Sequence, residues 1–302
     1  MSRPMLEIPT LPAPQSRTGS RHPSWIKVRA PQGARYEFVR EVLASRGLHT
    51  VCEEAECPNM GECWGHGTAT FMLLGEICTR GCRFCAVGKG KPEAPDPLEP
   101  EKIAEAVEAM KLDYAVLTSV DRDDLPDQGA GHFAQAIGAI KRRVPACGVE
   151  ALVPDFRGDG ECVQIVAQTA LTVFAHNIET VPRLYRRVRP GAEYERSLRV
   201  LELAKEHSRD PALLTKASLI LGLGEESREL EDVFADLRDA GCDILTLGQY
   251  LRPSQDQLPV VRYVPPEEFA ALRAVARSYG FRQVVSGPLV RSSYHAWEAV
   301  QG

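Results

Sequence analysis

Six of the nine cysteines in this chain fall in one stretch of the sequence, CEEAECPNMGECWGHGTATFMLLGEICTRGCRFC. The first triplet has the spacing C-x4-C-x5-C and consists of Cys52, Cys57 and Cys63. The second triplet has the spacing C-x3-C-x2-C and consists of Cys78, Cys82 and Cys85. Between them the apolar run TATFMLLG, residues 68–75, predicts one buried strand. The chain therefore presents two groups of thiols, one on each side of a strand.

Cysteines this close together can form disulfides, bind zinc or hold iron–sulfur clusters. Disulfides belong mainly to small secreted chains, whereas this chain has 302 residues, 44% of them hydrophobic, and shows no secretory signal. Structural zinc uses four closed ligands, usually in paired C-x2-C halves, which neither triplet supplies. Three thiolates on a four-iron cube leave one iron open for a substrate or cofactor. Iron–sulfur clusters are therefore favoured, and a zinc-stabilised, ligand-binding barrel stays as an alternative.

The second triplet, CTRGCRFC, resembles the signature of the radical S-adenosylmethionine (SAM) enzymes. In that family the open iron of a [4Fe–4S] cluster binds the amino and carboxylate groups of SAM, and an electron from the cluster cleaves SAM to methionine and a 5′-deoxyadenosyl radical. The resemblance makes Cys78, Cys82 and Cys85 the ligands of this cluster. It also places the backbone of Phe84 at the adenine, for which an ordinary core phenylalanine is the alternative.

The first triplet, in CEEAECPNMGECW, resembles the auxiliary-cluster motif of the lipoyl synthase family, and the similarity extends from about residue 24 to 297. The other segments that carry it are TSVDRDD at 118–124, PDFRG at 154–158, HNIETVPRLYRRVRPGAEY at 176–194, GLGE at 222–225, LTLGQYLRPS at 245–254 and SGPLVRSSYHA at 286–296. The resemblance implies an auxiliary [4Fe–4S] cluster on Cys52, Cys57 and Cys63. A serine oxygen of the RSSY segment would be its fourth ligand, which we assign to Ser293 with Ser292 as the alternative.

Beyond the cysteines the sequence alternates apolar strands with helices. The expected strands are 113–119, 148–154, 171–177, 215–222 and 243–249, with a short strand near 282–287. The expected helices are 99–111, 131–143, 158–169, 192–207, 226–240 and 265–279. Nearly continuous apolar strands separated by helices indicate a parallel α/β sheet. With strand 68–75 they make six βα units, and the resemblance selects a partial (β/α)6 TIM-like barrel of the radical SAM type.

Extensions are expected on both sides of this barrel. The segments are a disordered leader at 1–23, an N-terminal extension at 24–67 that carries the first triplet, the barrel core at 68–260, and a C-terminal helix and RSSY segment at 261–302. Within the N-terminal extension a helix is expected at 34–46. The first triplet should follow it in a loop that contains Pro58 and Gly61, after which GECWGHG, residues 61–67, predicts a short helix and a turn.

Polar side chains at the carboxyl ends of the strands are candidates for SAM binding, because active sites of parallel βα barrels lie there. By resemblance, Thr118 and Ser119 would bind the amino group of SAM and Arg189 its carboxylate. The carboxylate of Glu179 could accept hydrogen bonds from the ribose hydroxyls, and Asn177 could bond to SAM or substrate. Helix capping and ordinary ion pairing are the alternatives for these residues. Structural roles are expected for His66, His132 and His295, and core positions for Cys147, Cys162 and Cys242.

The function implied by the resemblance is lipoyl synthesis, a sulfurtransferase reaction. Sulfur from the auxiliary cluster would enter C6 and C8 of an octanoyl chain on a lysine of a lipoyl carrier domain, with two SAM molecules consumed. No side-chain base can deprotonate such carbons, so a cofactor must supply a radical. The alternatives are another two-cluster radical SAM enzyme, such as a methylthiotransferase, and a non-catalytic iron–sulfur electron carrier or scaffold.

The implied partners are an octanoylated lipoyl carrier domain or glycine cleavage H protein, a ferredoxin or flavodoxin as electron donor, and an iron–sulfur carrier protein. A net charge of −5 argues against nucleic-acid binding. The longest apolar runs are too short to span a membrane. Nine cysteines without a secretory signal favour the cytoplasm, and five prolines within residues 1–23 oppose a transit helix. We expect a cytoplasmic monomer.

Overall fold

One curled sheet organises the chain. The computed structural model describes residues 22–301 except 29, 67 and 295, so nearly all of the leader expected at 1–23 lies outside the described residues. In spatial order the strands of the sheet are β1 (His49–Thr50), β2 (Thr70–Leu73), β5 (Tyr114–Ser119), β6 (Gly148–Leu152), β7 (Val173–Ala175), β8 (Leu214–Leu221), β9 (Ile244–Gln249) and β10 (Gln283–Gly287). Every neighbouring pair from β2 to β10 is parallel, and β1 is antiparallel to β2.

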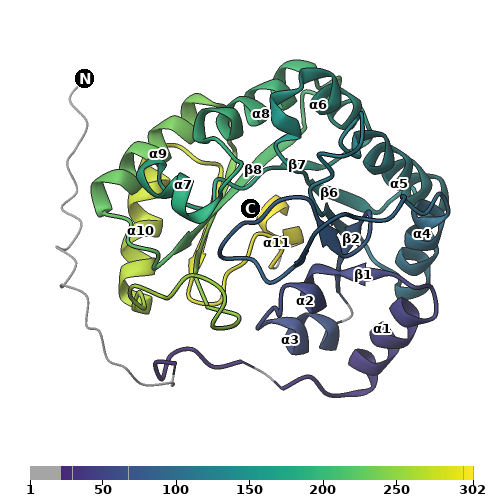
Figure 1. Ribbon diagram of the computed structural model, residues 1–302, viewed down its shortest axis with the longest axis horizontal. Helices are drawn as coiled ribbons and strands as arrows, with labels where there is room; N and C mark the ends of the chain where they lie inside the picture. Colours follow the sequence, from purple (N-terminus) through teal and green to yellow (C-terminus); the bar gives the residue numbers. More distant parts are fainter. Residues whose placement is uncertain (1–21, 29, 67, 295, 302) are drawn as a thin grey trace.

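Helices cover the outer face of the sheet, as Figure 1 shows. They are α4 (Glu99–Met110), α5 (Ala130–Arg143), α6 (Gly160–Ala167), α8 (Tyr194–His207), α9 (Ser227–Asp239) and α10 (Pro266–Ser278). With strands β2 and β5–β9 they form the six expected βα units, so the predicted α/β fold of a partial parallel barrel is confirmed. Strand β10 adds a seventh parallel strand at one edge, and β1 lies at the other edge.

The strands divide their side chains between two environments. Along β8, Ala217, Leu219 and Leu221 are buried in the apolar core that also contains residues of α9 and α10. Because side chains alternate across a strand, the intervening Lys216 and Ser218 face the barrel interior. A small apolar cluster of the described residues, formed by Val173, Ala175, Leu214 and Ile244, has Val300 packed against it. Since Lys216 and Ser218 are buried as well, the interior contains buried polar side chains beside apolar ones.

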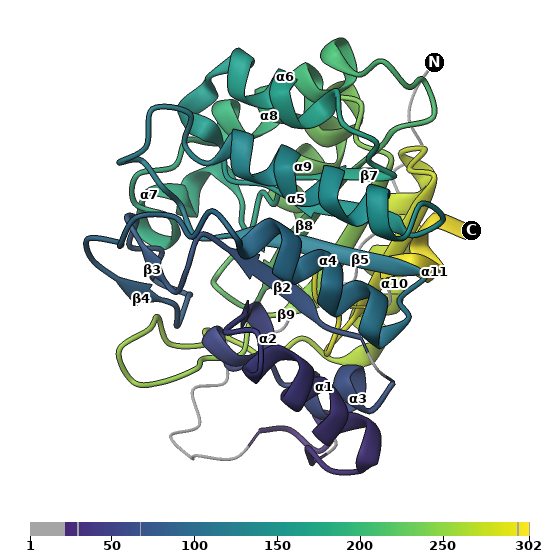
Figure 2. The ribbon, with the colours of Figure 1, turned by 90° about the vertical axis from the view of Figure 1, so that its right-hand side faces the viewer.

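Segments from both ends of the chain pack against the barrel. In the described part of the chain three helices precede it, α1 (Ala34–Ala44), α2 (Val51–Glu54) and α3 (Met60–Gly65), and α11 (Ala296–Gln301) follows it. The rings of Tyr36 and Trp64 lie 5.1 Å apart, and both residues belong to the same buried cluster as Phe71 of β2. Figure 2 shows α1–α3 beneath the barrel, with α7 (Tyr185–Val188) at one end of it and α11 at the other. Among the described residues no helix is long and apolar enough to cross a membrane.

Candidate active site

The second cysteine triplet follows β2 at the carboxyl end of that strand. Cys78 lies in the short strand β3 (Ile77–Cys78), which pairs in parallel with β4 (Gly88–Lys89) and folds the loop back on itself. Within the loop the backbone N–H of Cys85 donates to the carbonyl of Cys82 over 3.3 Å. All three cysteines are partly buried and free of disulfides. One compact loop thus brings the three sulfurs to the end of the sheet where barrel active sites lie.

Two backbone N–H groups point at the sulfur of Cys78. Those of Arg80 and Asp121 each donate to Cys78 Sγ over 3.4 Å. Burial raises the pKa of the Cys78 thiol to about 12, and the Asp121 carboxylate adds to this effect. Burial likewise raises the pKa of Cys85 to about 11. Without metal these groups are protonated at neutral pH, and a metal centre bound among them would replace their protons.

Three of the predicted SAM-contact residues lie together beyond β7. Asn177 Nδ2 donates to Glu179 Oε1 over 2.9 Å, and Arg189 Nη1 donates to the carbonyl of Asn177 over 2.7 Å. Burial raises the pKa of the Glu179 carboxyl, and the charge of Arg189 opposes that rise. Burial also raises the pKa of Cys82, again opposed by Arg189. Asn177, Glu179 and Arg189 therefore adjoin the second triplet.

Glu179 has an unusual backbone conformation for a side-chain-bearing residue, with a φ of 67° in the left-handed region. Its backbone forms a parallel bridge with Leu219 of β8, and its N–H donates to the carbonyl of Ser218 over 2.9 Å. Such a conformation persists only where surrounding contacts enforce it, and it is often found at functional sites. The neighbouring strand thus fixes where the Glu179 carboxyl points.

Thr118 and Ser119 end β5, and their side chains point to opposite faces of the strand. Thr118 Oγ1 donates to the carbonyl of Leu152 on β6 over 3.0 Å. Ser119 Oγ is buried and has no hydrogen-bond partner within the described part of the chain. Because these two side chains lie on opposite faces, a single ligand could contact only one of them. The side chain of Thr118 already bonds to β6.

Several buried polar atoms near the carboxyl ends of the strands lack a hydrogen-bond partner among residues 22–301 as described. They are Ser119 Oγ, His176 Nε2, Asn177 Oδ1, Thr180 Oγ1 and Arg189 Nε. Burial lowers the pKa of His176 to about 4, so this side chain is neutral at physiological pH. A buried polar group without a partner costs free energy, and native structures contain few of them. This concentration of unpaired donors and acceptors fits a polar cofactor such as SAM.

The first cysteine triplet lies on two short helices and their connection. The short helix predicted within GECWGHG is observed as α3, whereas the loop expected before it is wrong at α2. Cys52 lies in α2, Cys63 lies in α3, and Cys57 lies between them. Thr50 caps α2, with its Oγ1 accepting the N–H of Glu53 over 3.3 Å. The N–H of Cys57 then donates to the carbonyl of Cys52 over 3.0 Å. These backbone bonds hold the triplet in a compact turn.

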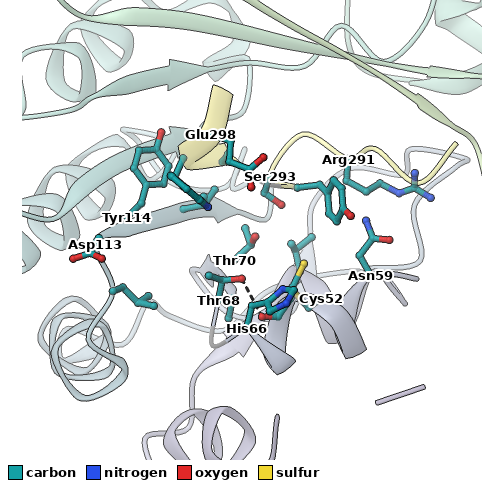
Figure 3. Close-up of a pocket in the computed structure, with 18 of the residues that line it drawn as sticks. Cys52, Asn59, His66, Thr68, Thr70, Asp113, Tyr114, Arg291, Ser293 and Glu298 are labelled. Atoms are coloured by element: carbon teal, nitrogen blue, oxygen red, sulfur yellow. Dashed lines mark hydrogen bonds between the residues drawn. The ribbon is translucent and has the colours of Figure 1, made fainter. Parts of the chain in front are cut away.

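The three cysteines of the first triplet line one cavity of about 800 Å³. Ser293 and Arg291 of the RSSY segment line the same cavity, and Figure 3 shows them across from Cys52. Ser292 is not among the lining residues. Asn59 Nδ2 donates to the carbonyl of Leu289 over 2.6 Å, which ties this C-terminal segment to the first triplet across 230 positions of sequence.

The thiols of the first triplet influence one another. Burial raises the pKa of Cys52 to about 12, with Cys57 contributing, and that of Cys63 to about 12, with Cys52 and Cys57 contributing. Neighbouring thiolates repel one another, so a metal centre that compensates their charge fits this set. The charge of Arg291 lowers the pKa of Cys57, although burial raises it more. Burial lowers the pKa of the Arg291 guanidinium, and the carboxylate of Glu179 in turn opposes that lowering, so this guanidinium is within electrostatic reach of both cysteine sites.

The remaining expectations concern residues outside these sites. Cys147, Cys162 and Cys242 are buried core residues, as predicted. His132 Nε2 lies 2.6 Å from Glu99 Oε2, which is a structural role, whereas His66 is exposed and lines the cavity. His295 lies outside the described residues.

Sequence reasoning missed Arg80, whose side chain is nearly buried beside the second triplet. The signal was present, because an arginine lies between the cysteines and carboxylates follow the next two strands in TSVDRDD and PDFRG. Nothing in the sequence alone, however, shows that these carboxylates converge on that arginine.

Comparisons with protein families match most of the chain. The radical SAM superfamily matches residues 72–248, and the N-terminal domain of lipoyl synthase of the radical SAM family matches residues 12–57. Lipoyl synthase of Methylococcus capsulatus is 57% identical over 277 residues, covering 91% of this chain and 85% of that protein. Lipoyl synthase of Halorhodospira halophila is 56% identical over 290 residues, covering 95% of this chain and 86% of that protein.

Solved structures with the same fold are more distant in sequence. The FeFe-hydrogenase maturase HydG from Carboxydothermus hydrogenoformans superposes with a TM-score of 0.56 at 15% identity, covering 77% of this chain and 65% of that one. Methylornithine synthase superposes with a TM-score of 0.51 at 12% identity, covering 87% of this chain and 81% of that one. These two likenesses support the fold alone.

Proposed function

Since this chain belongs to the lipoyl synthase family of radical SAM enzymes, we propose that its two cysteine triplets divide one reaction between two sites. The reaction replaces two C–H hydrogens of an octanoyl chain, at C6 and C8, with sulfur, using SAM and two [4Fe–4S] clusters. No protein base can remove hydrogen from such carbons, so the side chains of the chain bind, orient and enclose rather than deprotonate.

The second triplet is our proposed site for SAM. Cys78, Cys82 and Cys85 would hold its cluster, and two N–H groups already point at Cys78 Sγ. Next to them Asn177, Glu179 and Arg189 would bind the polar parts of SAM, with the backbone of Phe84 at the adenine. The unpaired Asn177 Oδ1 and Arg189 Nε support this role, because a ligand would supply their missing partners. Of Thr118 and Ser119, the better candidate for a SAM contact is Ser119, because its Oγ is buried and has no partner among the described residues.

The first triplet is our proposed sulfur-donating site, with Cys52, Cys57, Cys63 and Ser293 as ligands. The observation that carries this proposal is the shared cavity, in which Ser293 faces three cysteines that lie more than 200 residues away in the sequence. A serine oxygen is a harder and weaker ligand for iron than a thiolate. It can therefore leave more readily, which suits a cluster that is consumed as a reagent.

The substrate is a lipoyl carrier protein in the broad sense. We further propose that an octanoylated lipoyl domain or the glycine cleavage H protein docks to this chain, that a ferredoxin or flavodoxin reduces it, and that an iron–sulfur carrier protein restores the first cluster. We also propose that the enzyme acts as a monomer in the cytoplasm.

The test of this division of labour uses anaerobically reconstituted full-length protein with SAM, dithionite and an octanoyl-lysine peptide. Wild type should form 5′-deoxyadenosine and a dithiolated peptide. Cys52→Ala should form 5′-deoxyadenosine without adding sulfur, whereas the matched variant Cys82→Ala should form neither product. Mass spectrometry of the peptide and chromatography of the nucleoside measure both. Sulfur insertion by Cys52→Ala at the wild-type rate would contradict the proposal.

A further inference from the structure

The side chain of Arg80 is surrounded by carboxylates that come from two different strand ends. Its Nε and Nη2 donate to the two oxygens of Asp123, each over 2.8 Å. Its Nη1 lies 2.7 Å from Asp155 Oδ1 and 3.4 Å from Asp121 Oδ1. The side chain of Arg80 is 6% exposed and that of Asp155 is fully buried. Three carboxylates in two loops thus converge on one arginine of the cysteine loop.

These carboxylates are acidic residues of two sequence segments to which SAM binding gives no role. Asp121 and Asp123 belong to TSVDRDD after β5, and Asp155 belongs to PDFRG after β6. Asp155 is itself held in place, because its Oδ1 accepts the N–H of Arg157 over 3.0 Å and its Oδ2 lies 3.3 Å from Arg196 Nη1 of α8. Arg80 therefore connects the cysteine loop to a rigid part of the barrel.

The same contacts lead directly to the sulfur of Cys78. Arg80 and Asp121 supply the two N–H groups that donate to Cys78 Sγ. The carbonyl of Asp121 accepts both the N–H and the Oγ1 of Thr79, over 3.0 and 2.9 Å. The N–H of Asp123 donates in turn to Thr79 Oγ1 over 3.1 Å. The bidentate Arg80–Asp123 pair and this backbone network therefore both hold the cysteine loop against the segment that follows β5.

We propose that Arg80 is a positioning residue that holds two N–H donors on the Cys78 sulfur and thereby sets the reduction potential of the metal centre in the second triplet. This inference rests on the proposed function for the placement of a [4Fe–4S] cluster on Cys78, Cys82 and Cys85. Hydrogen bonds to ligand sulfurs stabilise the reduced, more negative cluster, and so they raise its potential. A bidentate arginine–carboxylate pair supplies the required rigidity, which lysine cannot reproduce.

An effect of charge alone can be distinguished from positioning, because the two predict opposite shifts of the reduction potential in the variant Asp155→Asn. Replacing Arg80 by glutamine removes a positive charge and the anchor, so both roles lower the potential. Replacing Asp155 by asparagine removes a negative charge, so charge alone would raise the potential. If the carboxylate acts by holding Arg80, its loss loosens the N–H donors and lowers the potential instead.

The experiment measures the midpoint potential by an EPR-monitored redox titration of full-length protein in the Cys52→Ala background, which leaves the second triplet as the cluster site. Arg80→Gln and Asp155→Asn should both shift the midpoint downward. We expect the reduced-to-oxidised ratio at a fixed poise to fall about tenfold in Arg80→Gln, which for one electron is about 59 mV. Arg80→Lys should recover only part of the shift, since it keeps the charge but lacks the bidentate pair. Iron content per chain is measured in parallel.

Arg262→Gln is the matched control, because it breaks another little-exposed arginine–carboxylate pair, with Glu268, that involves no residue of the cysteine loop. It should lower the unfolding temperature and leave the midpoint unchanged. If Arg80→Gln loads too little iron for titration, Asp123→Asn is measured instead, since it removes the bidentate pair and keeps the arginine. An unchanged midpoint in the loaded variants, or an upward shift in Asp155→Asn, overturns the proposal. An unmodified second triplet that binds no iron–sulfur cluster would instead contradict the proposed function.

Discussion

Ser293 occupies the cavity of the first triplet because neighbouring residues hold its segment there. The Asn59–Leu289 hydrogen bond fixes the segment on one side of Ser293. On the other side, Tyr294 OH donates to Glu62 Oε1 of α3 over 3.1 Å. These two bonds bracket the serine, so its position follows from contacts with the N-terminal extension. The chemistry of its oxygen can therefore be tested without removing what positions it.

Ser293→Ala should impair sulfur insertion while leaving 5′-deoxyadenosine formation close to wild type. The reason is that the second triplet keeps all its contacts, whereas the first loses an oxygen donor. Even the loss of a group that only orients a metal's direct ligands typically costs about 10–100-fold in affinity or activity, so the loss of a ligand oxygen should cost at least about tenfold in dithiolated peptide. Ser292→Ala is the matched control, because Ser292 does not line the cavity. Equal rates of sulfur insertion in the two variants would argue against the assignment of Ser293.

At the scale of residues, ligand sets that are close together in the sequence could be predicted. Partners that come together only through the fold could not. The spacing within each cysteine triplet is local, and both triplets form compact groups. The partners of Arg80 lie 41 to 75 positions further along the chain, and they meet it only because β2, β5 and β6 are neighbours in the sheet. The electrostatic reach of Arg291 to both sites likewise depends on where the fold places the C-terminal segment.

At the scale of elements, long apolar strands and amphipathic helices were predictable, and short elements were predictable only in part. The strand predicted at 243–249 is observed at Ile244–Gln249, and the helix predicted at 131–143 is observed at Ala130–Arg143. Helix α2 has only four residues, too few to show a helical period, whereas the short helix predicted within GECWGHG is observed as α3. One signal was available for α2, because Thr50 followed by Glu53 is the pattern of a capping box.

Gly248 of β9 allows the C-terminal segment to approach the sheet. A Cβ on Gly248 would lie 2.0 Å from the carbonyl oxygen of Val290 and 3.4 Å from Arg291 Nη1. Gly248→Ala should therefore displace this segment and destabilise the protein by about 1–3 kcal/mol, as overpacking does. Dithiolated peptide should decrease more than 5′-deoxyadenosine, because Ser293 moves with the segment. Thermal unfolding and the two product assays measure this.

Gly160→Ala controls for the loss of a glycine as such. Gly160 begins α6, and a Cβ there would make only ordinary contacts of 3.8 Å or more. Its stability should change little, and the ratio of the two products should remain that of wild type. A wild-type product ratio in Gly248→Ala would show that the close approach does not position the segment.

For the molecule as a whole, a buried ion pair inside the barrel links strands that are not neighbours. Lys216 Nζ of β8 lies 2.9 and 3.1 Å from the two oxygens of Glu150 on β6, and β7 lies between these strands. Tyr114 OH of β5 donates to Glu150 Oε2 over 3.1 Å. Both charged side chains are 1% exposed. Polar contacts across the strands thus connect β5, β6 and β8 inside the barrel.

Lys216→Met should strongly destabilise the protein, because it leaves the Glu150 carboxylate buried without its cation. Breaking one side of such a pair typically costs about 3–5 kcal/mol. Adding Glu150→Gln to Lys216→Met should recover part of the loss, since the remaining group is neutral and can still bond to Tyr114. Arg183→Met is the control, because its pair with Glu229 is half exposed and should be worth about 1 kcal/mol or less. Urea unfolding followed by circular dichroism compares the four proteins. If Lys216→Met proves no less stable than Arg183→Met, or the double variant no more stable than Lys216→Met, the interior pair does not stabilise the barrel in this way.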